Sequence, residues 1–129
     1  MTRTDDHYVE LGERADQSNT ERVDLFISLH YDGSEDPDLR GTTTYYFHES
    51  DYPIGRAVNQ RLAELETMPN NGVNFGNYQV LRENHQPSIL LELGYMTNPA
   101  DVPQISSQAY YEAVAEKIVA GITDYFQSL

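Results

Sequence analysis

The order of apolar and polar residues along the chain predicts strands that alternate with helices. The mostly apolar run at residues 23–29 does not alternate with polar positions, which is typical of a strand covered on both faces in the centre of a parallel sheet. Residues 88–93 repeat this design, with Glu92 after Ile89, Leu90 and Leu91, and are also predicted to be a strand. Residues 42–47 (TTTYYF) carry the β-branched and aromatic side chains that strands favour. Residues 78–82 (YQVLR) are the fourth predicted strand.

Apolar positions at helical spacing predict three helices. Leu11 and Ala15 lie four residues apart among charged residues, which predicts a short and mostly exposed helix within residues 8–20. Ser106 or Ser107 can cap the last helix of the chain. The apolar stripes of the second and third helices are Ile54, Val58, Leu62 and Leu65, and Tyr111, Val114, Ile118, Ile122, Tyr125 and Leu129.

The remaining segments are predicted to be loops and turns. Residues 30–41, 69–77 (PNNGVNFGN) and 83–87 are rich in Asp, Asn, Gly and Pro, which interrupt regular structure. Residues 97–107 are predicted to be irregular. Because helices alternate with strands, the predicted fold class is α/β, and no repeat or linker divides the chain.

Length and composition limit the class of protein. The 129 residues and the 39% apolar fraction fit one domain or part of one. The net charge of -13, from 21 acidic and eight basic residues, argues against binding to nucleic acid or to an anionic membrane. No apolar stretch is long enough for a membrane span, and the first ten residues lack the core of a signal peptide. An exported protein would therefore be seen here after processing or as a fragment.

His30 and Glu92 are the candidate functional residues: His30 follows the strand predicted at residues 23–29, and Glu92 follows three apolar residues inside the strand predicted at residues 88–93. The carboxyl ends of strands in open α/β sheets are where functional groups are exposed, although a histidine there can also be a packed, hydrogen-bonded residue. A glutamate inside the run Ile-Leu-Leu-Glu-Leu costs several kcal/mol in desolvation unless it finds a partner or a proton. That partner could be a backbone donor, Arg14 or Arg82. Otherwise Glu92 is a catalytic carboxylate with a raised pKa.

The absence of cysteine leaves imidazole and carboxylate as the groups that could hold a metal ion. A histidine that binds a metal and a glutamate that transfers protons are the minimum for metal-assisted hydrolysis. Three blocks carry these residues and resemble one family: TRTDDHYVELGERADQSNTERVDLFISLHYDGS, RGTTTYYF and PSILLELGYMTNPAD. They are similar to the catalytic domain of the zinc-dependent N-acetylmuramoyl-L-alanine amidases, amidase type 3. LLELGYMTN is the most specific block.

The resemblance implies a site, a substrate and a mechanism. In that family two histidines and a glutamate hold Zn²⁺, and a further glutamate acts as base; His30 matches the second histidine ligand and Glu92 the base. The implied reaction is hydrolysis of the amide between N-acetylmuramic acid and the L-alanine of the peptidoglycan stem peptide, by a water that zinc activates. Asn71 and Gly72 would lie near the peptide groove as substrate contacts. The implied location is extracellular, in the cell wall or the periplasm.

The resemblance also implies a mixed, largely parallel sheet with helices on both faces, from which the family's first strand and first helix are missing. The family's first histidine and its glutamate ligand precede the first matching block, so residues 1–129 are predicted to be the C-terminal portion of one amidase catalytic domain. His7, His48 and His85 are expected to be solvent-facing loop residues rather than replacement ligands.

Two other functions remain open from the sequence. One is a non-catalytic remnant that binds peptidoglycan or regulates a complete amidase. The other is a different zinc hydrolase of similar fold, such as a carboxypeptidase.

Overall fold

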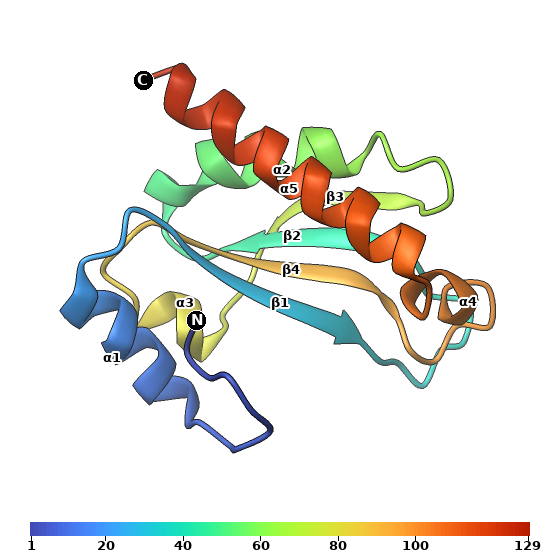
Figure 1. Ribbon diagram of the computed structural model, residues 1–129, viewed down its shortest axis with the longest axis horizontal. Helices are drawn as coiled ribbons and strands as arrows, with labels where there is room; N and C mark the ends of the chain where they lie inside the picture. The colour runs from blue at the N-terminus through green and yellow to red at the C-terminus, as the bar shows by residue number, and fades with distance from the viewer.

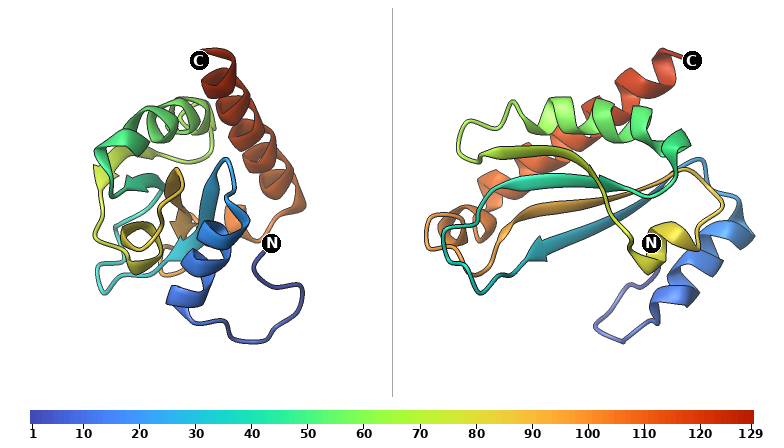
Figure 2. Two further views of the ribbon diagram at one scale, coloured as in Figure 1. Left: turned by 90° about the vertical axis from the view of Figure 1, so that its left-hand side faces the viewer. Right: turned by 180° about the vertical axis from the view of Figure 1, so that it is seen from behind.

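The computed structural model describes residues 1–129 as a four-stranded sheet between two layers of helices (Figure 1). Helices α2 and α5 cover one face, and α1 and α3 lie on the other, as the end-on view shows most clearly (Figure 2). The elements are α1 (Leu11–Glu21), β1 (Phe26–Asp32), β2 (Thr42–Tyr46), a 3₁₀ turn η1 (Glu49–Asp51), α2 (Tyr52–Leu62), β3 (Asn70–Phe75), α3 (Gln79–Arg82), β4 (Ser88–Tyr95), α4 (Val102–Ile105) and α5 (Gln108–Gln127).

The strand order is β1-β4-β2-β3, and the sheet is mixed. Strand β1 pairs with β4 in parallel and β2 with β3 in parallel, whereas β2 and β4 are antiparallel. The predicted α/β class, with a mostly parallel sheet and helices on both faces, is confirmed. None of the helices is both long and apolar enough to cross a bilayer.

The two apolar runs have different positions in the sheet. All eight residues of β4 are buried, so β4 is the strand that is covered on both faces. The prediction that residues 23–29 form a central strand covered on both faces is wrong, because β1 is an edge strand that pairs on one side only. The side chain of Leu29 is 60% exposed. The run also begins later than predicted and extends to Asp32, so His30 lies inside β1.

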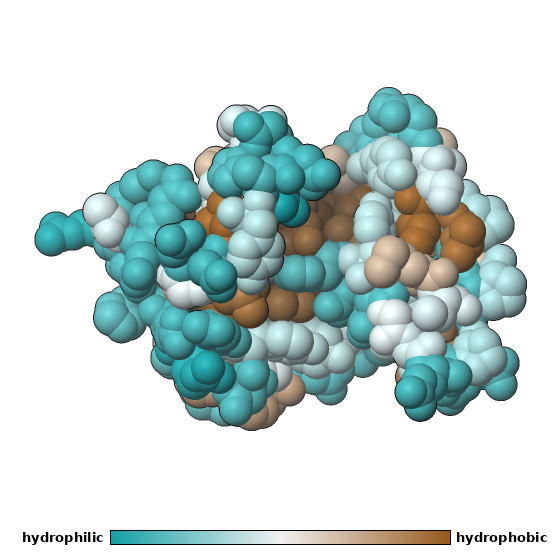
Figure 3. All heavy atoms as spheres, turned by 90° about the horizontal axis from the view of Figure 1, so that it is seen from below, coloured by the Kyte–Doolittle hydropathy of each residue, from teal (hydrophilic) through white to brown (hydrophobic).

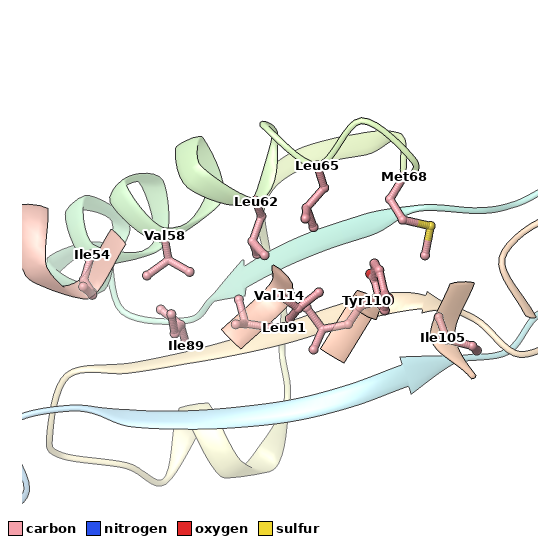
Figure 4. Packing of buried hydrophobic residues seen from close by; sticks show 11 residues of the cluster. Ile54, Val58, Leu62, Leu65, Met68, Ile89, Leu91, Ile105, Tyr110 and Val114 are labelled. Atoms are coloured by element: carbon pink, nitrogen blue, oxygen red, sulfur yellow. The ribbon is translucent and has the colours of Figure 1, made fainter. Parts of the chain in front are cut away.

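Alternate residues of β4 divide the core between the two faces of the sheet. Ile89, Leu91 and Leu93 pack against α2 and α5 in the larger cluster (Figure 4). Leu90 points to the opposite face and packs with Val80 and Leu81 of α3 in a smaller cluster. The molecular surface below the sheet has apolar atoms recessed between hydrophilic segments (Figure 3). The buried apolar cluster on this face is thus the smaller of the two.

Two adjoining segments differ from the sequence prediction. Residues 69–77, predicted as a loop, contain strand β3, and residues 78–82, predicted as a strand, contain the helical turn α3. Strand β3 lacks an apolar pattern because it is an edge strand whose Asn70 bonds to polar groups on β2 and α2. Helix α3 is too short to show a helical repeat, and its buried residues Val80 and Leu81 are consecutive.

The other boundaries agree more closely with the prediction. The predicted serine cap of the last helix is confirmed at Ser107, whose Oγ accepts a hydrogen bond from the Tyr110 amide at 3.2 Å. Helix α2 ends at Leu62, and Leu65 packs into the same core from the following turn. The segment predicted to be irregular contains one further helical turn, α4.

Gly121 sets the separation between α2 and α5. A Cβ atom added there would lie 2.5 Å from Val58 Cα and 2.9 Å from the Ala57 carbonyl oxygen, both of them backbone atoms. We therefore expect Gly121→Ala to lower the free energy of unfolding by about 1–3 kcal/mol, in spite of alanine's higher helix propensity. Urea denaturation would measure the change.

Gly12 provides the matched control, because it also lies in a helix and its added Cβ would make only ordinary contacts, at 3.5 Å or more. Gly12→Ala should leave stability unchanged or raise it by up to about 1 kcal/mol. Equal effects of the two substitutions would contradict the proposed close contact between α2 and α5.

Candidate active site

His30 and Glu92 lie side by side on adjacent parallel strands. They are direct Cα partners in the β1–β4 pairing, so their side chains leave the sheet on the same face. Thr43 is the partner of Glu92 on the other side, across the antiparallel pairing with β2. The strand pairings therefore bring His30 and Glu92 together, and the three side chains form a row across β1, β4 and β2.

Glu92 is buried without a compensating partner. It is 7% exposed, and its Oε2 atom is buried with no hydrogen-bond partner. The two arginines that could have neutralised it bond elsewhere: Arg14 Nε donates to the Val9 carbonyl oxygen, and Arg82 donates to Asn77. Burial, and secondarily the charge of Asp32, raise the pKa of Glu92 from 4.5 to about 7. A carboxyl group with this pKa can both accept and return a proton near neutral pH.

The half-buried imidazole of His30 favours the neutral form. Its Nε2 atom lies 2.7 Å from Oγ of Ser28, which is two residues earlier on the same face of β1. Burial, and then the charge of Arg14, lower the pKa of His30, although Asp32 opposes the shift. Neutral imidazole is the form that binds metal ions.

Asn71 and Gly72 lie at a bulge in β3. Thr42 and Thr44 of β2 pair with Asn70 and Val73, so Asn71 and Gly72 together stand opposite Thr43. The positive φ of Gly72, 84°, is the backbone conformation that favours glycine at such a bulge.

The bulge turns the Asn71 side chain toward β2. Its Nδ2 atom donates to the Arg40 carbonyl oxygen at 2.9 Å and to Thr43 Oγ1 at 3.4 Å. The structure thus brings Asn71 to the Glu92 side of the sheet through Thr43. Gly72 shapes the backbone, and its amide donates to Asn70 Oδ1.

The three remaining histidines do not join His30. His7 and His85 are exposed, as expected, and His7 contacts Asp5. His48 is half-buried rather than solvent-facing, because its Nε2 lies 3.1 Å from the carbonyl oxygen of Asn84. It follows β2, which runs opposite to β4, and so it lies at the other end of the sheet from Glu92.

The donors within these residues do not make a complete zinc site. Zinc hydrolases use about three protein ligands and keep one position open. Nowhere in the structure do three His, Cys, Asp or Glu side chains come together in a group that could hold a metal ion. His30 and the unpartnered Glu92 are suitable neighbours for a metal ion, but they do not suffice alone.

Sequence reasoning missed the residues on β2 that adjoin the pair. Thr43 and Tyr45 share the face of Glu92, and together with Arg40 they line a hollow of about 360 Å³. The sequence signal for Thr43 was only that of a strand residue. Thr43 lies beside Glu92 because β2 is inserted between β4 and β3, which the sequence does not indicate.

Comparison with known proteins decides the family. The family model of the N-acetylmuramoyl-L-alanine amidases matches residues 1–124. The chain belongs to this family. Its fold agrees with solved amidase catalytic domains: the catalytic domain of CwlV from Bacillus (Paenibacillus) polymyxa superposes with a TM-score of 0.93 and is 29% identical. That match covers 98% of this chain and 70% of the other.

Two further relatives give the same result. The amidase AmiC2 of Nostoc punctiforme superposes with a TM-score of 0.91 at 35% identity, covering 98% of this chain and 71% of the other. The probable cell wall amidase LytH of Staphylococcus epidermidis is 36% identical over 128 residues, which is 99% of this chain. The chain spans 42% of the length of this curated amidase relative.

Proposed function

We propose that these residues form part of the catalytic domain of a peptidoglycan hydrolase, which cleaves the amide between N-acetylmuramic acid and the L-alanine of the stem peptide. The observation that carries the proposal is the buried, unpartnered Glu92 beside His30, in a chain of the amidase family. The names of the relatives, cell wall amidase among them, support the bond and the place of action. That place is the cell wall, outside the cell or in the periplasm.

Glu92 is the proton carrier in the proposed reaction. Its carboxylate takes a proton from the water whose oxygen attacks the amide carbonyl carbon. As the C–N bond breaks, the carboxyl group returns the proton to the departing nitrogen, so the products are a carboxylic acid and a free amine. The pKa near 7 suits both steps, because the group is neither a strong acid nor a strong base at neutral pH.

We further propose zinc as the cofactor, with His30 as one ligand and the other ligands outside residues 1–129. The unpaired edge of β1 supports the proposal that a further part of the domain supplies these ligands. Beside that edge, a groove of about 400 Å³ runs between β1 and α1. A strand added there in parallel would end next to His30, because the carboxyl ends of parallel strands meet at one edge of a sheet.

The metal role of His30 is testable by occupancy. In the protein with the complete ligand set, His30→Ala should weaken zinc binding by at least about tenfold, since even substitutions behind a ligand cost that much. Zinc content after dialysis and calorimetric titration would measure the loss. His85→Ala, which changes an exposed histidine, is the control and should leave binding unchanged. Full zinc content in His30→Ala would refute the ligand assignment.

Product analysis tests the reaction itself. Muropeptide incubated with the protein should yield the intact stem peptide with a free L-alanine amine, whereas a carboxypeptidase would give a shortened peptide.

The incomplete metal set favours one alternative, a remnant that binds wall fragments without cleaving them. If the protein is such a remnant, it should neither bind zinc nor release stem peptide from muropeptide. This should hold even when the assay uses a longer form that includes a strand along the edge of β1.

A further inference from the structure

The hollow next to Glu92 has the features of a binding site for a charged peptide. Thr43 lies between the two, because it is the strand partner of Glu92 and also lines the hollow. The hollow is also lined by the aromatic ring of Tyr45 and by the side-chain amides of Asn71 and Asn74. A ligand that reaches Glu92 can therefore extend over β2 into the hollow without crossing another element.

Arg40 is the fixed cation of this hollow. Its Nε donates to Oδ1 of Asp101 at 3.0 Å, and Asp101 is fully buried. Oδ2 of Asp101 accepts from the backbone amides of Gly41 at 2.7 Å and Tyr95 at 3.1 Å, so the carboxylate is held on three sides. Only the Nε atom of Arg40 is used in this way. Both Nη nitrogens remain free to donate, from a guanidinium group whose position is set from behind.

The neighbouring amides add donors and acceptors for a peptide backbone. Asn71 uses its Nδ2 for Arg40 and Thr43, which leaves its Oδ1 free to accept. Asn74 is held by the Asn71 carbonyl oxygen at 3.3 Å. The exposed carboxylate of Asp38 lies at the rim and gives the hollow charge of both signs.

We infer that this hollow binds the stem peptide, and that Arg40 recognises the free α-carboxylate of its second residue. The inference rests on the proposed function for the identity of the ligand. In that substrate the glycan side of the scissile bond is uncharged, whereas the peptide side carries ionised groups. A hollow with an anchored guanidinium group and two side-chain amides matches the peptide side. Arginine is suited to this role, because its planar fork binds carboxylates through two parallel hydrogen bonds.

The test compares two peptides that differ in one group. The probes are L-alanyl-γ-D-glutamyl-L-lysine, with a free α-carboxylate on its second residue, and the counterpart in which that carboxylate is an amide. Calorimetric or NMR titration of the 129-residue chain should show about tenfold tighter binding of the carboxylate form, as a charge-assisted pair predicts. In Arg40→Gln the two peptides should bind equally, and Arg40→Lys should keep part of the preference.

Two further variants control for the loss of any positive charge and for a failure of Arg40→Gln to fold. Arg56→Gln removes an exposed arginine of α2, on the opposite face of the sheet, and should keep the full preference. Asn71→Asp changes neither side chain of the Arg40–Asp101 pair, although it loses the donor to the Arg40 carbonyl oxygen; its negative charge should weaken binding of the carboxylate peptide more than that of the amide peptide, through repulsion. It therefore serves even if Arg40→Gln does not fold.

The outcomes separate this inference from the proposed function. Equal binding of the two peptides by the wild type, or no binding of either, would overturn the role of Arg40, whatever the result with muropeptides. A preference that disappears in Arg40→Gln would support it. If that preference is present but muropeptide is not cleaved by the completed protein, the proposed reaction fails and the peptide site stands.

Discussion

Replacing Glu92 with glutamine should lower the rate of muropeptide hydrolysis by about 10²–10⁴-fold, the range typical of a lost general acid–base group. Glutamine has almost the same shape but cannot take a proton from water or return one to the leaving amine. The loss should appear in kcat. The assay uses the form of the protein that hydrolyses muropeptide and measures the release of stem peptide. Zinc content should not change, because the proposed ligand His30 is not altered.

Glu112→Gln is the matched control for this substitution. Glu112 is an exposed glutamate of α5 that bonds only to Gln108, and its loss should leave kcat within about twofold of the wild type. Substantial turnover by Glu92→Gln would sink the assignment of Glu92 as proton carrier. A simultaneous loss of zinc would show instead that Glu92 helps to hold the metal.

The metal-free chain should show an unusual dependence of stability on pH that disappears in Glu92→Gln. Burial raises the pKa of Glu92 from 4.5 to about 7. Between these values the folded state keeps a proton that the unfolded state has lost, so stability falls as pH rises. The penalty is absent below about pH 4.5, develops up to pH 7 and is complete above it, where it amounts to about 3 kcal/mol.

Urea denaturation in the presence of a chelator, repeated from pH 5 to pH 8, would measure this effect. The free energy of unfolding of Glu92→Gln relative to wild type should increase from pH 5 to pH 8, by most of the expected 3 kcal/mol. Glu112→Gln should follow the wild-type curve in parallel. If the free energies of unfolding of Glu92→Gln and wild type differ by the same amount at every pH, Glu92 has the same pKa in the folded and unfolded states, which would contradict the prediction.

Elements with long apolar patterns were predictable from the sequence. The helix with Ile54 and Val58 and the last helix follow from stripes that face one core, and β4 follows from apolar residues that are buried on both faces of the sheet. The pairing of His30 with Glu92 was also predictable, because two parallel strands end at the same edge of a sheet. Here a local pattern and the general rule for parallel strands sufficed.

The rest depended on contacts between distant segments. Strand β3 is polar, since as an edge strand it bonds through Asn70 instead of packing apolar side chains. The position of β1 at the edge could not be seen in its apolar run, which resembles that of the central strand β4. Thr43 lies beside Glu92 only because β2 is inserted between β4 and β3 and runs antiparallel to β4. No repeat or spacing within β2 encodes that neighbour relation.

The reversed direction of β2 has a consequence for how such enzymes can diverge. Strand β1 ends and β2 begins at the same edge of the sheet, so the connection at residues 33–41, which contains Arg40, crosses the carboxyl end of β4 near the site. Lengthening or shortening this connection would reshape the entrance without disturbing any hydrogen bond between strands. We expect relatives that act on differently modified peptidoglycan to differ most here, while the paired strands keep the residues equivalent to His30 and Glu92 side by side.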